Sequence, residues 1–381
     1  MSDTVARARQ SLKRRGVADA VLAWWDRNRR DLPWRARPGE TADPYRVWLS
    51  EILLQQTTAT GAAPYFLDFL RRWPTVEQLA DAPMEEIMAA FAGLGYYSRA
   101  RNLHACAKAV AAAGGVFPSD EAGLRALPGV GPYTAAAVAA IGFGRPAAPV
   151  DGNIARILSR LFAFETPIAA NRADLDEVAR ALTPHGRPGD FAQALMDIGA
   201  MVCRPRNPDC GRCPLDKACL AARTGEPERF PSRLEKKARP AKVGAAFYAV
   251  RSNGAFLARR RPPKGLLGST MELPGGAWRI GELGAVGDHE APFAAAWVRL
   301  PDEVEHVFTH FSLRLALFAV EAGFVEPPPG HVWIAPDEIG AAGFSGLMRK
   351  AAERAASAWR DSRIRTHSGA SSARIPSGTR S

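Results

Sequence analysis

Cysteine is scarce in this chain of 381 residues, and its five copies are unevenly placed. Cys106 stands alone, whereas the other four lie between residues 203 and 219. A secreted protein that depends on disulfides is usually small and spreads its cysteines along the whole chain. The sequence therefore excludes a disulfide-stabilised scaffold, and it favours a reducing cytoplasm and a metal-binding cysteine cluster.

Long hydrophobic runs are also missing. The longest run, residues 135–144, is about half of the roughly 20 residues that a membrane-spanning helix needs, and Arg145 ends it. The first 15 residues contain five Lys or Arg and lack the apolar stretch of a secretory signal. We therefore expect neither membrane insertion nor export.

Acidic residues are outnumbered by basic ones. Lys and Arg total 50 against 39 Asp and Glu, which gives a formal net charge of +11 and an isoelectric point near 9.8. This excess favours a polyanionic partner, although it says nothing about the fold. With 47% hydrophobic and 23% charged residues, the composition is that of a folded protein, and the length allows two or three domains.

Two regions of different character follow one another along the chain. Apolar residues recur every three or four positions in the first region and in short strand-like runs in the second, with a linker rich in proline and charge between them. The expected division is a helical region over residues 1–223, a linker over 224–242, a mixed α/β domain over 243–361 and a disordered tail over 362–381. The expected helices are residues 47–61, 83–91, 100–113, 134–142, 154–164, 174–182 and 344–359. The expected strands are residues 243–250, 255–259, 306–308 and 313–320.

Four cysteines form the spacing C-x6-C-x2-C-x5-C, namely Cys203, Cys210, Cys213 and Cys219. Four thiolates this close in sequence suit an iron–sulfur cluster or a structural zinc ion, both of which accept four cysteine ligands. Four free core thiols are the alternative, which is uncommon at this density in a cytoplasmic protein. Spacing alone does not separate iron from zinc.

The segment 127–138, LPGVGPYTAAAV, combines a Gly-x-Gly turn with the start of a helix. Gly129 and Gly131 permit positive φ and a close backbone approach, and the free N–H groups at the helix start suit a DNA phosphate. The pattern is typical of a helix-hairpin-helix motif. A helix–helix turn without a ligand is the alternative.

Glu51 lies in a run that is apolar nearly all round, so the predicted helix is buried and the carboxylate is either paired or kept for chemistry. Gln55 is expected on the same face, with Thr58 nearby. Burial would raise the Glu51 pKa and let this residue hold a proton near neutral pH, as a general acid must. The alternative is a glutamate near a helix start that the helix dipole stabilises.

Two other segments carry candidate functional residues. Asp151 directly precedes a predicted helix, so it is either an ordinary N-cap or a second carboxylate whose charge stabilises a developing cation. Tyr96 and Tyr97 lie on a glycine-flanked turn before Arg99 and Arg101. Aromatics beside arginines suit stacking on bases and contacts with phosphates, and the alternative is a solvated surface turn.

Several short motifs occur together in a fixed order. They are LPW at residues 32–34, SEILLQQT at 50–57, GLGYY at 93–97, LPGVGPYTA at 127–135, VDGN at 150–153 and the cysteine cluster. In this combination the chain resembles the adenine DNA glycosylases of the MutY type, which belong to the helix-hairpin-helix superfamily that includes endonuclease III. The resemblance covers about residues 25–220 and continues more weakly in the second domain.

The resemblance implies a multidomain fold, with an all-α helix-hairpin-helix catalytic region in two lobes on either side of a DNA groove. It also implies that the four cysteines hold a 4Fe-4S cluster rather than zinc. Enzymes of this type remove adenine mispaired with 8-oxoguanine, so the implied partner is double-stranded DNA with that mispair. A monomer associated with the nucleoid is expected.

The resemblance also assigns roles to individual residues. Glu51 is expected to protonate the flipped adenine and to assist the water, and Asp151 to stabilise the oxocarbenium ion of the sugar. Tyr133 and Asn153 are expected to order the site. Gln56 matches a position that such enzymes insert at the lesion pair, and Tyr96 matches another, as base flipping requires.

Tyr133 stands where superfamily members that also cut the DNA backbone carry a lysine. A lysine amine can form a Schiff base with the sugar, and a tyrosine cannot. The sequence therefore predicts a monofunctional glycosylase.

The second domain resembles the Nudix-like α/β module that recognises 8-oxoguanine in these enzymes. Phe308, Thr309 and His310 match its F-S-H loop, with threonine in place of the commoner serine, so a hydroxyl is retained. The acidic run that binds magnesium in true Nudix hydrolases is missing after residues 274–276. No hydrolase activity is therefore expected.

Three alternative functions fit less of the sequence. An endonuclease III-like glycosylase and lyase acting on oxidised pyrimidines is disfavoured by Tyr133 and by the extra domain. A non-catalytic iron–sulfur DNA-binding protein has no need of both Glu51 and Asp151. A nucleotide pyrophosphohydrolase needs the magnesium-binding carboxylates that are missing.

Overall fold

The computed structural model describes residues 16–94, 98–232, 239–262, 265–323 and 326–369. The chain divides into two compact units. The first comprises Met1–Ala90 and Arg99–Lys236, and the second comprises Phe91–Ser98 and Lys237–Ser381. No helix in the described residues is long and apolar enough to cross a membrane.

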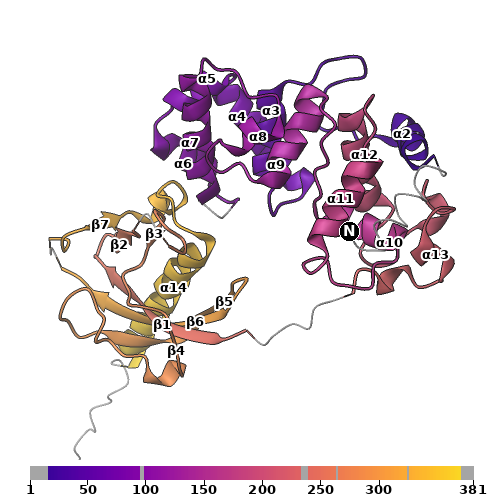
Figure 1. Cartoon of the computed structure of the whole chain (residues 1–381). Coiled ribbons are helices and arrows are strands. Elements are labelled where there is room, and N and C mark those ends of the chain that lie inside the picture. Colours follow the sequence, from indigo (N-terminus) through magenta and orange to yellow (C-terminus); the bar gives the residue numbers. More distant parts are fainter. Residues whose placement is uncertain (1–15, 95–97, 233–238, 263–264, 324–325, 370–381) are drawn as a thin grey trace, which may run out of the picture. The chain divides into compact units, whose positions relative to one another are not determined.

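The first unit is built from helices, and its described residues contain no strand, as the sequence predicts. Figure 1 shows these helices in indigo to magenta. They are α2 (Val17–Asn28), α3 (Pro44–Leu53), α4 (Ala59–Arg72), α5 (Val76–Asp81), α6 (Met84–Ala90), α7 (Ser98–Ala112), α8 (Glu121–Arg125), α9 (Pro132–Ala137), α10 (Gly152–Leu161), α11 (Arg172–Leu182), α12 (Pro188–Met201) and α13 (Leu220–Arg223). A π-helical turn, Val138–Gly142, continues α9.

Helix α10 shows why these segments fold as they do. Its apolar residues Ile154, Ile157, Leu158 and Leu161 recur at helical spacing and are buried. They form one core with residues of α2, α11 and α12, so the apolar stripe of α10 is covered on several sides. Because Asp151 is the N-cap of α10, this packing also fixes the position of its carboxylate.

The predicted helix over residues 47–61 is two helices in the structure. Helix α3 ends at Leu53, and α4 begins at Ala59, where Thr58 is the N-cap and accepts a hydrogen bond from the N–H of Gly61. Between them Gln56 has a φ of 60°, in the left-handed region. The apolar pattern predicted a continuous helix because it runs through this break.

In the second unit, seven strands of the described residues form one mixed sheet. They are β1 (Ala241–Val250), β2 (Phe256–Arg260), β3 (Met271–Glu272), β4 (Arg279–Ile280), β5 (Val298–Val307), β6 (Ser312–Glu321) and β7 (His331–Ile334). The main path has the order β3-β2-β1-β6-β5, while β4 pairs with β1 and β7 with β2. Strands β1 and β6 are parallel, with Phe247 opposite Phe318. The sequence missed most of β5 because Pro301 and several charged residues hide its alternation.

Both faces of this sheet are covered. Helix α14 (Gly346–Gly369) packs on one face, where Leu347, Met348 and Ala351 join the sheet residues in a buried core (Figure 1). On the other face Phe247 and Phe318 are covered by Trp297. Helix α14 continues to Gly369, beyond residue 362 where the disordered tail was expected, because no glycine or proline interrupts the chain before that point. The rest of that tail, residues 370–381, lies outside the described residues.

Candidate active site

Two carboxylates and a tyrosine from three helices meet in the first unit. Glu51 belongs to α3, Tyr133 to the first turn of α9, and Asp151 caps α10. The Tyr133 hydroxyl forms a hydrogen bond with Glu51, and the charge of Asp151 acts on Glu51 as well. The residues are separated by up to 100 positions in sequence, so the helical packing alone brings them together.

Glu51 is 6% exposed, and its pKa is raised from 4.5 to about 7. Burial is the main cause, and the negative charge of Asp151 adds to it, whereas the hydrogen bond from Tyr133 and the charge of Arg35 oppose it. Glu51 lies in the last turn of α3, at the negative end of the helix dipole. The alternative interpretation, a glutamate favoured by a nearby helix start, is therefore wrong.

Asp151 is the N-cap that its sequence position suggested. One carboxylate oxygen accepts from the N–H of Ile154 at 2.7 Å and so caps α10, and the other accepts from Nδ2 of Asn153 at 3.0 Å. Burial raises the pKa of Asp151, although these hydrogen bonds oppose the shift. The cap thus holds a partly buried carboxylate whose charge acts on Glu51.

Asn153 connects this carboxylate with the cysteine-rich loop. Its Oδ1 accepts from Arg156 at 2.9 Å, and Nε of Arg156 donates to the carbonyl of Cys203 at 2.9 Å. Gly199 of α12 packs so closely that a Cβ there would lie 2.6 Å from the Cβ of Asn153. Only glycine allows α12 and α10 to approach this closely.

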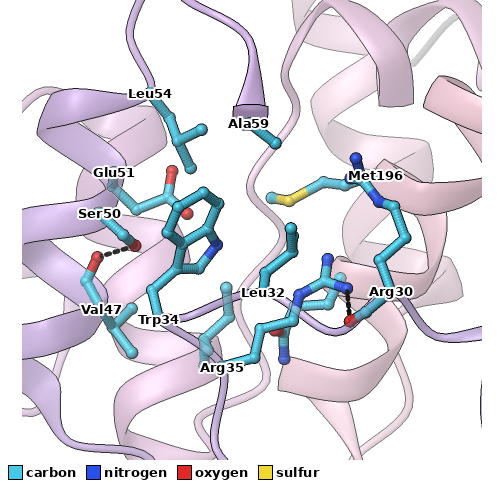
Figure 2. Close-up of a pocket in the computed structure, with 12 residues that line it drawn as sticks. Arg30, Leu32, Trp34, Arg35, Val47, Ser50, Glu51, Leu54, Ala59 and Met196 are labelled. Atoms are coloured by element: carbon cyan, nitrogen blue, oxygen red, sulfur yellow. Dashed lines mark hydrogen bonds between the residues drawn. The ribbon is translucent and has the colours of Figure 1, made fainter. Parts of the chain in front are cut away.

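A pocket opens beside Glu51. Figure 2 shows Glu51 on one wall of this pocket, with Arg30 and Met196 on the opposite wall. The full lining consists of Arg30, Leu32, Trp34, Arg35, Val47, Ser50, Glu51, Leu54, Ala59, Ile141, Gln193 and Met196. Apolar walls with a few polar groups are typical of a site that binds a small organic group.

The helix-hairpin-helix segment has the predicted tight turn. Gly129 has a φ of 72°, and a Cβ there would lie 2.5 Å from the Cβ of Asn102, so this position requires glycine. Gly131 differs from the expectation, because its φ is −83°. It is the N-cap of α9 without a side chain to cap it, and the space around its Cα is open, which suits the approach of a ligand.

The turn after α3 presents Gln56 to solvent. Gln55, which was expected on the helix face of Glu51, instead lies beyond the helix end, where its carbonyl accepts from the buried Arg99 at 2.6 Å. Arg99 also donates to the carbonyl of Ile52 at 3.0 Å and so caps the end of α3. Tyr96, the second expected insertion residue, lies outside the described residues.

The four clustered cysteines line one small cavity, and the buried Arg160 is part of its wall. Burial raises the pKa of Cys213 to about 12, and the charges of the other three cysteines act in the same direction. Within the described residues, no group of three or more His, Cys, Asp or Glu side chains is arranged to hold a metal ion.

In the second unit, residues 308–311 form a tight turn between β5 and β6. The N–H of Phe308 donates to the carbonyl of Phe311 at 2.8 Å, and Phe308 packs against Trp278. Thr309 and His310 are exposed at the tip. Phe308 therefore anchors the turn, and its two neighbours are the residues that can reach a ligand.

Comparison with known proteins identifies both units. Residues 49–183 match the family described as HhH-GPD superfamily base excision DNA repair protein, and residues 245–354 match the family described as NUDIX domain. The adenine DNA glycosylase of Homo sapiens is 33% identical over 395 residues, which cover 87% of this chain and 72% of that protein. The adenine DNA glycosylase of Mycolicibacterium smegmatis is 41% identical over 196 residues, or 51% of this chain and 66% of that protein.

A solved structure resembles part of the chain. A thermostable thymine-DNA glycosylase is 33% identical with a TM-score of 0.50, and the match covers 58% of this chain and 100% of that one. The human relative is identical to this chain at one third of the aligned positions, and the alignment covers most of both chains. The chain therefore belongs to the adenine DNA glycosylase family, within the HhH-GPD superfamily of base excision DNA repair proteins.

Proposed function

We propose that this enzyme hydrolyses the bond between adenine and deoxyribose in double-stranded DNA, at adenines paired with 8-oxoguanine and with guanine. The observation that carries the proposal is the buried Glu51, whose pKa of about 7 lets it hold a proton at neutral pH, close to a second carboxylate, Asp151. The names of the relatives support adenine as the base that is removed.

In the proposed reaction the flipped adenine occupies the pocket beside Glu51. Glu51 donates its proton to a ring nitrogen of the base, which makes the base a better leaving group. The glycosidic bond then breaks, its electron pair goes to the base, and C1′ of the sugar becomes part of an oxocarbenium cation. The charge of Asp151 stabilises this cation. Water adds to C1′, and the ionised Glu51 accepts its proton.

The remaining residues of the site hold these two carboxylates in place. The Tyr133 hydroxyl donates to Glu51, and the Asn153 amide donates to Asp151. Because position 133 carries no amine, the site offers no Schiff-base nucleophile there, and we assign the enzyme to the monofunctional class.

The DNA contacts that we propose come from three segments. The hairpin around Gly129 and Gly131 binds a phosphate of the backbone, because free N–H groups begin α9 there. Gln56 enters the base stack at the mispair, for which its exposed turn next to the pocket is suited. Tyr96 is assigned to the same step by its sequence alone.

A 4Fe-4S cluster held by Cys203, Cys210, Cys213 and Cys219 fits the cysteine-rich loop. The donor set consists of four sulfurs around one cavity, and Arg160 donates from its Nη1 toward the sulfur of Cys203 at 3.3 Å. A bound cluster would cross-link this loop and hold it against α10. The catalytic step itself uses Glu51 and Asp151.

The second unit is proposed to read 8-oxoguanine through Thr309 and His310. Both side chains are exposed at the tip of a turn whose base is fixed by Phe308. A hydroxyl and an imidazole can both exchange hydrogen bonds with the edge of an oxidised purine. We propose that the enzyme acts on DNA as a monomer in the cytoplasm, at the nucleoid.

Base release from defined duplexes tests the proposal. We expect single-turnover excision of adenine opposite 8-oxoguanine, slower excision opposite guanine and none opposite thymine. Strand breaks should appear only after alkali or heat, and borohydride should trap little protein on the DNA. Release of an oxidised pyrimidine, or efficient borohydride trapping at neutral pH, would instead identify a lyase of the endonuclease III kind.

A further inference from the structure

Asp197 of α12 is completely buried and is bound by two arginines. Arg35 donates from Nη1 to Oδ2 at 2.7 Å and from Nη2 to Oδ1 at 2.9 Å, which is a bidentate pair. Arg30 donates from Nε to Oδ1 at 2.6 Å and from its backbone N–H to Oδ2 at 3.1 Å. The two arginines come from a loop more than 160 positions away in the sequence.

Both arginines belong to the wall of the pocket that contains Glu51 (Figure 2). The Arg35 side chain is 5% exposed, and its guanidinium lies over the ring of Trp25 at 4.7 Å. It also donates to the carbonyl of Arg30 at 3.1 Å. A cation buried this deeply needs a partner, since its charge is costly to remove from water.

We propose that Asp197 is a positioning residue for base excision, because it holds Arg35 in the pocket wall as an ion pair beside the general acid Glu51. This inference rests on the proposed function, since it concerns the proton that Glu51 delivers. Asp197 itself touches neither the base nor the sugar in this scheme. It acts through Arg35.

The charges around Glu51 explain why the pair matters. Tyr133, Asp151 and Arg35 act on the pKa of Glu51, and the charge of Arg35 lowers it. Arg30 is the other cation of the pocket lining. The negative charge of Asp197 balances one of the two positive charges, so Glu51 faces a cluster with less net positive charge than the two arginines alone would give. Without Asp197, an unbalanced cation would favour the ionised form of Glu51, which has no proton to donate.

Two single variants and their combination test this role through the pH profile of single-turnover excision. Asp197→Asn leaves Arg35 unbalanced, so the pH above which excision falls should move down by about one unit. Arg35→Met leaves Asp197 paired with Arg30 alone, so the net positive charge beside Glu51 falls by one and that pH should move upward. The double variant removes both charges and should return the fall to nearly the pH of the unaltered enzyme. A structural role alone would slow excision without opposite shifts.

A matched control and a folding measurement accompany the series. The control is Asp190→Asn, because Asp190 lies on the same helix as Asp197 and forms an exposed ion pair with Arg187. Its pH profile should not change. Asp197→Asn strands two arginines in the interior, so thermal melting of every variant is measured, and Asp197→Glu, which restores the charge, should recover the unaltered profile. If Asp197→Asn does not fold, the profiles of Arg35→Met and the double variant still decide, because the proposal requires them to differ.

The proposal fails if folded Asp197→Asn keeps the unaltered profile, or if the double variant shifts as far as a single one. These failures differ from a failure of the proposed function. If the unaltered enzyme releases no adenine, the function is wrong, whereas an active enzyme whose pH profile ignores Asp197 overturns only the role of Asp197.

Discussion

Nη1 of Arg160 lies 3.3 Å from the sulfur of Cys203. The arginine is 2% exposed and also donates to the carbonyls of Arg204 and Pro205, at 2.7 and 3.1 Å, so its guanidinium is fixed in place. The arginine thus provides a fixed hydrogen-bond donor to this sulfur, a kind of contact that sulfur ligands of iron–sulfur clusters receive.

The purified enzyme should therefore be yellow-brown and contain iron, and Arg160→Met should bind less iron than the unaltered protein. The reason is that the sulfur of Cys203 loses its hydrogen-bond donor, and the loop loses the contacts of Arg160 with the carbonyls of Arg204 and Pro205. Iron content per protein and visible absorbance are the measurements. Arg71→Met, which removes an exposed arginine of α4, serves as the control and should keep its iron. A colourless, fully active protein with stoichiometric zinc would contradict the cluster assignment.

Glu51→Gln should reduce excision by at least about 100-fold while DNA binding is largely kept. The substitution keeps the shape of the side chain but removes the proton that Glu51 delivers. Single-turnover excision and a binding titration on the same duplex separate the two effects. Near-normal excision by this variant would assign Glu51 to a structural role.

The same variant tests how the free energy of unfolding depends on pH. The pKa of Glu51 is raised from 4.5 to about 7 in the folded state, so the stabilisation that its protonated form provides is fully present below pH 4.5 and is lost as the pH rises through 7. Glu51→Gln removes this loss. Its free energy of unfolding should exceed that of the unaltered protein at pH 8 by up to about 3 kcal/mol, and by much less at pH 5. Urea unfolding at both pH values is the measurement, and an equal gap at both would mean that Glu51 has an ordinary pKa.

Thr309→Val should weaken the preference for 8-oxoguanine over guanine opposite the adenine. It removes one exposed hydroxyl at nearly constant volume, so discrimination should fall by about the 0.5 to 1.5 kcal/mol of a net hydrogen bond. The ratio of excision rates on the two duplexes measures it. Thr309→Ser keeps the hydroxyl and should keep the preference. If Thr309→Val discriminates as well as the unaltered enzyme, lesion recognition lies elsewhere.

The sequence predicted the parts of the fold and site that depend on local patterns. Regular apolar spacing indicated helices such as α10, and Asp151 before that helix was recognised as a potential cap. The burial of Glu51 also followed from its apolar neighbours. These features depend on residues within a few positions of one another, so a single sequence contains enough information to predict them.

Features that depend on distant partners could not be predicted in this way. Helix α3 ends where Arg99, more than 40 positions away, donates to the carbonyls of Ile52 and Gln55, and nothing in the local pattern signals this break. Likewise, Arg35 and Asp197 are separated by 162 positions, and each looks like an ordinary surface charge in the sequence. The only hint was that Arg35 directly follows the LPW motif.

Helix α10 positions one residue of the candidate active site at its start and one residue that contacts the cysteine-rich loop near its end. Asp151 caps its start, and Arg160 near its end faces the cysteine-rich loop, so a single rod of ten residues, about 15 Å long, joins them. A helix of this length loses its hydrogen bonds cooperatively. We therefore expect unfolding of α10 to release the cysteine-rich loop and to displace Asp151 in a single event. Inactivation should accordingly be abrupt, with the surviving molecules fully active at every stage.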